Sequence, residues 1–198
     1  GSLLHRDTFK FDKIKGYLNK LLSKGIFIIP NTSKTEKEIL EFNNELGSKL
    51  PFISENGAAI KGLDLLNSNL PKELILSREK IILINIFERS VPLYLQKKCK
   101  WLSKMDKKKQ SFIFGLEEEK LKMALDRNYS VPFIFEGTKS EKKDLYKILK
   151  KKGLALQEGG RVINLTDKVN KAKALQVFVR FFKKKNKNLK TVAVGDNY

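Results

Sequence analysis

The chain has 198 residues, of which 41% are hydrophobic, so it can bury the core of one large domain or of two small ones. Its apolar runs are much shorter than the roughly 20 residues of a membrane span and no signal peptide opens it, so we expect a cytoplasmic protein without membrane association. A single cysteine, Cys99, and a single histidine, His5, exclude an internal disulfide, a zinc cluster and a Ser-His-Asp triad. Any metal ion must therefore be held by carboxylates.

The formal net charge of +19 is compatible with a nucleic-acid partner, because basic residues release counterions from phosphate backbones. However, only six of the 41 basic residues are arginine, the usual reader of base edges. Aromatic residues such as Phe178 and Phe182 fall on an apolar helix face instead of alternating with lysines. We therefore expect solvated lysines that attract small anions, and keep a non-catalytic basic nucleic-acid-binding domain as the alternative.

The first elements in chain order predict a parallel α/β layer. Apolar residues at helical spacing followed by Gly25 predict a helix over 10–24, and the run "IFII" predicts a buried parallel strand over 26–29. In "NTSKTEKEILEFNNELG", a capping box of Ser33 and Glu36 predicts the start of a second helix, and Gly47 predicts its end. The order helix, strand, helix is typical of this layer.

The middle of the chain has a different pattern. Residues 62–160 contain two predicted strands, "KIILINIF" and "VPFIFEG", and the helix "SEKKDLYKILKKKG", with Ser140 as its N-cap and Gly153 as its stop. A helix containing Leu175 and Phe178 and a buried strand "TVAV" then resemble the first elements. The sequence thus predicts a Rossmann-like parallel core, residues 1–61 and 161–198, with an inserted α+β domain, residues 62–160.

Polar residues follow the predicted core strands, where ligands bind in parallel sheets. Thr32 and Ser33 lie where a strand meets a helix N-terminus, which suits a phosphate, and Asp196 follows the last strand, where a carboxylate suits Mg²⁺. Lys171 begins the preceding helix and could add a positive charge. Taken singly, Ser33 is equally well a helix cap, Asp196 a turn residue and Lys171 a surface lysine.

Together and in this order, these residues resemble the haloacid dehalogenase superfamily of phosphatases. The "GSLL" at the start resembles the end of its first motif, which includes Ser2; the alternative is that Gly1 and Ser2 come from a cloning vector. Thr32 matches the second motif, Lys171 the third, and Asp196 in "GDNY" the fourth. The resemblance implies a C2-type cap between the second and third motifs. It also implies that the nucleophilic aspartate and the last acidic residue lie beyond the two ends, so we expect the chain as printed to be inactive.

Four ordered segments resemble the mannosyl-3-phosphoglycerate phosphatases over nearly the whole chain: "TSKT", "PFISENGAAI", "DRNYSVPFIFEG" and "EGGRVINLT". Two positions depart from that family, since Val131 replaces a glutamate and Ala172 a glycine. The first departure bears on sugar selectivity. The resemblance implies Mg²⁺-dependent hydrolysis of mannosyl-3-phosphoglycerate, with glucosyl-3-phosphoglycerate or another sugar phosphate as the alternative substrate.

The resemblance also implies roles for individual residues. An aspartate would attack phosphorus, a second aspartic acid would protonate the leaving hydroxyl, and water would hydrolyse the aspartyl-phosphate. Thr32 would bind a phosphoryl oxygen, Lys171 would offset negative charge and Asp196 would hold Mg²⁺. Arg161 suits a glycerate carboxylate because its planar fork binds two oxygens. The substrate-binding residues implied are Ser2, Ser33, Lys34, Asn56, Arg127, Ser130, Gly159, Gly160 and Arg161.

Overall fold

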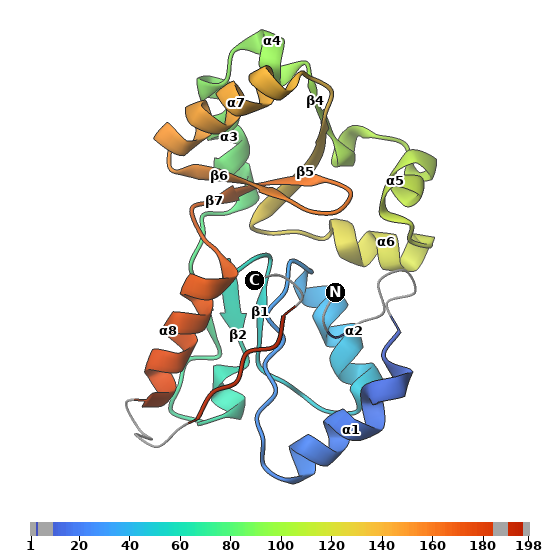
Figure 1. The fold of residues 1–198 in the computed structure, drawn as a ribbon, viewed down its shortest axis with the longest axis vertical. Helices are drawn as coiled ribbons and strands as arrows, with labels where there is room; N and C mark the ends of the chain where they lie inside the picture. The colour runs from blue at the N-terminus through green and yellow to red at the C-terminus, as the bar shows by residue number, and fades with distance from the viewer. Residues whose placement is uncertain (1–2, 4–9, 184–189, 196–198) are drawn as a thin grey trace.

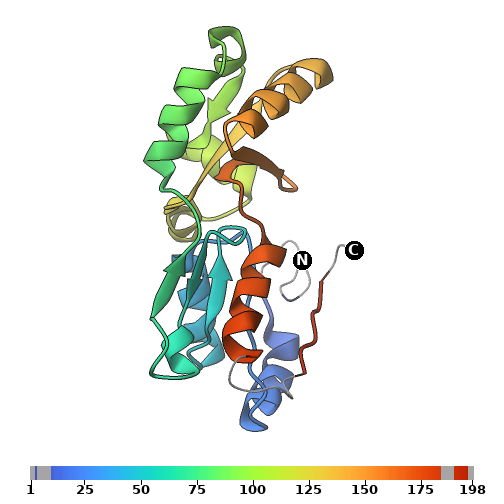
Figure 2. The same ribbon diagram turned by 90° about the vertical axis from the view of Figure 1, so that its left-hand side faces the viewer.

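The computed structural model describes residues 3, 10–183 and 190–195, and these form two lobes stacked along the long axis of the molecule (Figures 1 and 2). The first lobe contains α1 (Asp12–Ser23), α2 (Glu36–Leu46), β1 (Phe52–Ser54), β2 (Ala59–Lys61), η1 (Leu63–Leu65), β3 (Glu73–Ile75) and α8 (Lys171–Lys183). The second lobe contains α3 (Lys80–Ser90), α4 (Leu93–Gln96), β4 (Cys99–Trp101), η2 (Leu102–Lys104), α5 (Lys107–Phe114), α6 (Glu118–Leu125), β5 (Ser130–Phe135), α7 (Lys139–Lys151), β6 (Leu154–Glu158) and β7 (Ile163–Asp167).

The sheet of the first lobe has the order β1-β2-β3, and both pairings are antiparallel. Helix α8 packs on this sheet and buries Ala174 and Phe178 against Ile53 and Ile60. The predicted helix containing Leu175 and Phe178 is therefore confirmed, and its apolar stripe explains why it lies there. A separate cluster, which includes Phe11, Leu18, Leu46 and Leu50, joins α1 to α2.

The parallel sheet predicted for the core is not found among the described residues. Residues 26–30 form no strand, and the parallel pairing in this part of the chain is an isolated bridge between Asn31 and Ile53. Phe27 is 57% exposed and Val192 is 90% exposed, so neither "IFII" nor "TVAV" is the buried strand that we predicted. A short parallel strand needs hydrogen-bonded neighbours as well as cover. Ile28 and Ile29 are half-buried against two different clusters, but within the described residues no strand pairs with either segment.

Both predicted N-caps are wrong by two residues. The capping box of α2 joins Thr35 and Glu38 instead of Ser33 and Glu36, and the N-cap of α7 is Thr138 instead of Ser140. Each segment contains two candidate N-cap residues, two positions apart. The N-cap in the structure is in both cases a threonine followed three residues later by a glutamate, which completes the capping box. The helix over 10–24 is confirmed as α1, and Gly47 ends α2 in the left-handed conformation, with φ 78°.

The second lobe is a four-stranded antiparallel sheet, in the order β4-β5-β7-β6, with α3 and α7 packed on it. The strand predicted from "VPFIFEG" is confirmed as β5, but "KIILINIF" forms helix α3 instead of a strand. Leu83 and Phe87, four residues apart, are buried in the core while Ile81 is 55% exposed. A continuous apolar run does not distinguish a strand from a helix, and packing on the sheet decides this one.

The chain crosses between the lobes twice, after β3 and after β7. Strand β3 pairs with β2 in the first lobe, and β7 pairs with β5 and β6 in the second. Arg78, in the first crossing, donates hydrogen bonds from Nε and Nη2 to the Asp167 carboxylate, both at 2.8 Å. The two crossings are therefore held together. No helix within the described ranges is both long and apolar enough to cross a membrane.

Candidate active site

Three loops of the first lobe meet at the side that faces the second lobe: residues 31–35, 54–57 and 168–171. The Thr32 N–H donates to the Ile53 carbonyl at 3.0 Å, and the Asn56 N–H donates to the Thr32 carbonyl at 2.9 Å. The Glu55 N–H donates to the Lys34 carbonyl, also at 2.9 Å. These three bonds hold the loop that contains Thr32 against the loop that follows β1.

The N-terminus of α8 completes this group. The Asn31 side-chain amide donates to the Lys171 carbonyl at 3.1 Å, which places the first residue of α8 beside the Thr32 loop. Gly57, with φ 98°, lies so close to the chain before α8 that a Cβ there would stand 2.4 Å from the Asn170 carbonyl oxygen. The close approach therefore requires glycine at position 57. The structure thus brings together Thr32 and Lys171, which are 139 residues apart in the sequence.

The environment of the Thr32 loop suits an anion. The Thr32 hydroxyl oxygen accepts the Lys34 N–H at 3.2 Å, and Ser33 is exposed and free of the helix-capping role. Lys34 forms an ion pair with Glu38 at 2.6 Å. The N-terminus of α8, where the Asn170 side chain accepts the Lys173 N–H at 2.8 Å, adds the positive end of a helix dipole. Asn56 adopts a left-handed turn, with φ 62°, which asparagine tolerates.

The candidate residues of the second lobe fall into two groups. Arg127 and Ser130 are buried at the junction of the lobes, where the Arg127 guanidinium reaches the Ser33 carbonyl. Gly159, Gly160 and Arg161 are exposed on the β6–β7 hairpin, and Arg161 donates a hydrogen bond to the Phe114 carbonyl of α5. Within the described part of the chain, Arg161 makes no contact with the first lobe. The structure therefore joins the first group, but not the second, to the Thr32 loop.

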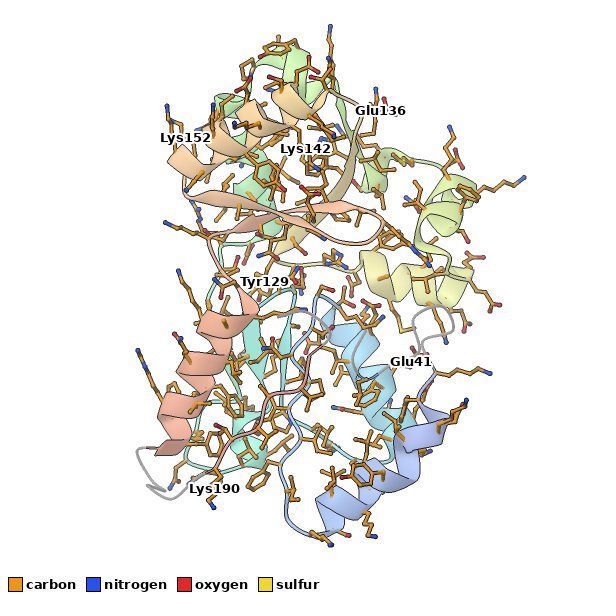
Figure 3. The ribbon with its side chains drawn as sticks, viewed as in Figure 1. Glu41, Tyr129, Glu136, Lys142, Lys152 and Lys190 are labelled. Atoms are coloured by element: carbon orange, nitrogen blue, oxygen red, sulfur yellow. The ribbon has the colours of Figure 1, made fainter. Side chains whose placement is uncertain are left out.

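Sequence reasoning selected Asn56 in the "ENGA" segment, but the neighbouring Glu55 makes the contacts between the lobes. Its buried carboxylate accepts hydrogen bonds from the backbone N–H groups of Asn128 and Tyr129 and from the Ser130 hydroxyl. Figure 3 shows Tyr129 at the junction. The signal available in the sequence was the position of an acidic residue directly after the short segment "PFIS", whose residues are all apolar except the last.

A magnesium site is not formed by the described residues alone. Within residues 3, 10–183 and 190–195, no three histidine, cysteine, aspartate or glutamate side chains gather as metal ligands would. Asp196, the residue predicted to hold Mg²⁺, lies outside the described residues, as does Ser2. The roles of Asp196 and Ser2 therefore stay predictions.

Two curated relatives match nearly the whole of this chain and about three quarters of their own length. A glucosyl-3-phosphoglycerate/mannosyl-3-phosphoglycerate phosphatase of Persephonella marina is 31% identical over 207 residues, covering 100% of this chain and 76% of the relative. A mannosyl-3-phosphoglycerate phosphatase of Pyrococcus horikoshii is 28% identical over 193 residues, covering 94% of this chain and 77% of the relative.

Solved structures share the fold at low sequence identity. A haloacid dehalogenase-like hydrolase from Bacillus subtilis superposes with a TM-score of 0.63 at 14% identity, covering 92% of this chain and 76% of that one. A sugar phosphatase of haloacid dehalogenase subclass IIB gives 0.59 at 14%, covering 92% and 73%. At this identity the likeness shows the α/β fold alone. The model of the haloacid dehalogenase-like hydrolases matches residues 1–198. The chain therefore belongs to the haloacid dehalogenase-like hydrolase family.

Proposed function

We propose that this chain belongs to a phosphatase that hydrolyses mannosyl-3-phosphoglycerate or glucosyl-3-phosphoglycerate with the help of Mg²⁺. The observation that carries the proposal is the convergence of the Thr32 loop with the N-terminus of α8 at Lys171. The names of the relatives from Persephonella marina and Pyrococcus horikoshii support the substrate class. A small sugar phosphate also agrees with the strongly positive chain, which attracts anions.

In this proposal the candidate catalytic residues, Thr32, Lys171 and Asp196, act on the phosphoryl group. The Thr32 hydroxyl donates to a phosphoryl oxygen, and the Lys171 ammonium offsets the negative charge of the phosphate and of its attacking carboxylate. Mg²⁺, held with the help of Asp196, would neutralise charge on the phosphoryl oxygens. Lys34 and Ser33 line the approach to the same loop. These groups stabilise charge that develops during transfer, which is where electrostatic stabilisation contributes most.

We further propose that the second lobe is the cap that selects the substrate. The pairings of β3 and β7 favour boundaries in the crossings 76–79 and 167–170 over the predicted 62 and 160. Arg161, beside Gly159 and Gly160 at the hairpin, is the proposed partner of the glycerate carboxylate. Val131, which replaces the glutamate of the resembling phosphatases, is buried and pairs with Leu165. A buried valine offers no hydrogen bond to a hexose, so both hexoses stay candidates.

The test is phosphate release by the full-length protein that carries this sequence, assayed with Mg²⁺. The substrates are mannosyl-3-phosphoglycerate, glucosyl-3-phosphoglycerate and p-nitrophenyl phosphate. We expect kcat/KM for one of the sugar substrates to exceed that for p-nitrophenyl phosphate. Equal values for all three would contradict a cap that selects glycosyl phosphoglycerates, and no hydrolysis of any ester would refute the phosphatase.

A further inference from the structure

Glu55 is in an unusual position for a charged residue. It follows β1 in the first lobe, its side chain is only 2% exposed, and its backbone is left-handed, with φ 44°. Among the described residues, its carboxylate accepts hydrogen bonds only from the second lobe: from the Asn128 N–H at 2.9 Å, the Tyr129 N–H at 3.1 Å and the Ser130 hydroxyl at 2.6 Å. A buried carboxylate is stable only when it is satisfied in this way.

Arg127 completes the same network from the other side. Its guanidinium donates from Nε to the Ala124 carbonyl at 3.0 Å, and from Nη1 to the Ser130 hydroxyl at 3.0 Å and the Ser33 carbonyl at 3.2 Å. Ser130 therefore accepts a hydrogen bond from Arg127 and donates one to Glu55. Burial lowers the pKa of Arg127, and the nearby carboxylates of Glu55 and Glu38 oppose this shift.

These contacts reach the loop proposed to bind phosphate. Arg127 holds the carbonyl of Ser33, and the backbone N–H of Glu55 holds the carbonyl of Lys34. The Thr35 hydroxyl also donates to the Met123 carbonyl of the second lobe at 2.8 Å. A shift of the second lobe would therefore strain the backbone directly after Thr32, at Ser33, Lys34 and Thr35.

We propose that Glu55, Arg127 and Ser130, here called the junction network, are positioning residues that fix the cap over the Thr32 loop. This inference rests on the proposed phosphatase function. It differs from the sequence-based expectation, in which Arg127 and Ser130 bind the substrate directly. The guanidinium is already bound to three protein oxygens and is buried, so a direct sugar contact would have to replace protein partners.

The first test compares a large and a small substrate. Arg127→Lys keeps the charge but loses the planar fork, and Glu55→Gln keeps the shape but replaces one acceptor oxygen by a donor group. A misplaced Thr32 loop should lower kcat/KM for the sugar substrate and for p-nitrophenyl phosphate by similar factors, about tenfold to a hundredfold. A loss confined to the sugar substrate would overturn the proposal. Matched controls are Arg89→Lys and Glu88→Gln on α3, which are exposed and outside this network.

A double-mutant cycle asks whether the two residues act together. If Arg127 and Glu55 hold one network, the double variant should lose less activity on p-nitrophenyl phosphate than the product of the two single losses, by about threefold or more. A double-variant loss equal to the product of the two single losses would mean that the residues act independently, and it would overturn the network. If Glu55→Gln does not fold, Ser130→Ala takes its place, because it removes only the hydroxyl that links them.

A third measurement does not depend on activity. Spin labels at Ser68→Cys and Lys152→Cys, both exposed, report the distance between the lobes, while burial raises the pKa of Cys99 to about 12 and protects it from labelling. We expect one narrow distance distribution for the labelled parent and a broader one after Arg127→Lys or Glu55→Gln. An unchanged distribution would overturn the proposal. If the wild type hydrolyses no ester, the proposed function fails, and this measurement still tests the network.

Discussion

Two arginines of the second lobe show how burial separates roles that the sequence alone does not. Arg127 is 7% exposed, and its guanidinium donates hydrogen bonds to three oxygens at the lobe junction. Arg161 is exposed on the β6–β7 hairpin and donates to the Phe114 carbonyl. Only the exposed guanidinium has donors that a ligand can reach without removing a buried partner. Arg161 is therefore the better candidate for a substrate carboxylate.

We expect Arg161→Ala in the full-length protein to lower kcat/KM for the sugar substrate by about a hundredfold, because one charged partner of the carboxylate is removed. Hydrolysis of p-nitrophenyl phosphate should change little, since that ester has no glycerate. Steady-state kinetics with both substrates measures the ratio. Equal losses on the two esters would remove Arg161 from substrate selection.

Lys171 is the second residue with a direct role to test. Its position at the start of α8, beside the Thr32 loop, predicts that Lys171→Ala lowers kcat by about a hundredfold or more, the usual effect of deleting a group that stabilises developing charge. The free energy of unfolding should barely change because the side chain is exposed. Lys173→Ala, two residues along the same helix and also exposed, is the control. Normal turnover in Lys171→Ala would mean that Lys171 is an ordinary surface lysine without a role in catalysis.

At the level of elements, one of two threonine helix caps connects the lobes as well as starting its helix. Thr35 begins α2, where its hydroxyl oxygen accepts the Glu38 N–H at 3.3 Å and its hydroxyl donates to the Met123 carbonyl at 2.8 Å. Thr138 begins α7 with the same capping box, but it is exposed and bonds only within its own helix among the described residues. The two threonines therefore share a capping box, but Thr35 is also buried and makes a contact across the junction.

This pair leads to a stability prediction. Thr138→Ala should lower the free energy of unfolding by about 1 kcal/mol, the usual loss of an N-cap. Thr35→Ala should lower it by about 2 to 3 kcal/mol, because Thr35 is buried and its hydrogen bond to the Met123 carbonyl is lost together with the cap. Urea denaturation of the two variants and the parent gives both values. A smaller loss for Thr35→Ala than for Thr138→Ala would show that the contact between the lobes contributes no stability.

At the level of the whole molecule, the two crossings between the lobes are joined by Arg78 and Asp167. The hydrogen bonds from the Arg78 side chain, followed by those from the backbone N–H groups of Arg78 and Lys168, lower the pKa of Asp167 to about 2, against the opposing effect of burial. A folded-state pKa below the unfolded value means that the pair stabilises the fold above the unfolded pKa. That contribution is lost as the pH falls from about 4 toward 2.

We therefore expect Arg78→Ala to lower the free energy of unfolding by about 1 kcal/mol at pH 6, a value reduced for the partial exposure of Arg78. The difference in the free energy of unfolding between variant and parent should shrink toward zero as the pH falls toward the pKa of Asp167 in the folded protein. Urea denaturation between pH 6 and pH 2 measures it. Lys100→Ala is the control, since Lys100 pairs with Glu136 at 3.6 Å and both side chains are about half exposed. A difference that stays constant with pH would contradict the assigned pair.

Local patterns in the sequence were sufficient for several elements and for the family. The apolar spacing of α1 and α8 and the glycine after α2 predicted these helices, because amphipathic periodicity and left-handed glycine are local properties. The ordered segments around Thr32, Glu55, Arg127 and Arg161 indicated haloacid dehalogenase-like phosphatases, and the match over residues 1–198 agrees with that superfamily. The roles of single residues did not follow from these patterns.

The tertiary structure decided what depends on partners distant in the sequence. Whether residues 80–87 form a strand or a helix depended on the sheet that buries Leu83 and Phe87, since the run is apolar in both arrangements. Nothing local in the sequence distinguishes Glu55 from other acidic residues. Its role depends on the N–H of Asn128, 73 residues away in the sequence, which donates a hydrogen bond to its carboxylate. Amphipathic spacing and glycine stops are contained within a few turns of chain, whereas burial and hydrogen-bond satisfaction at the junction of two lobes exist only after the chain has folded.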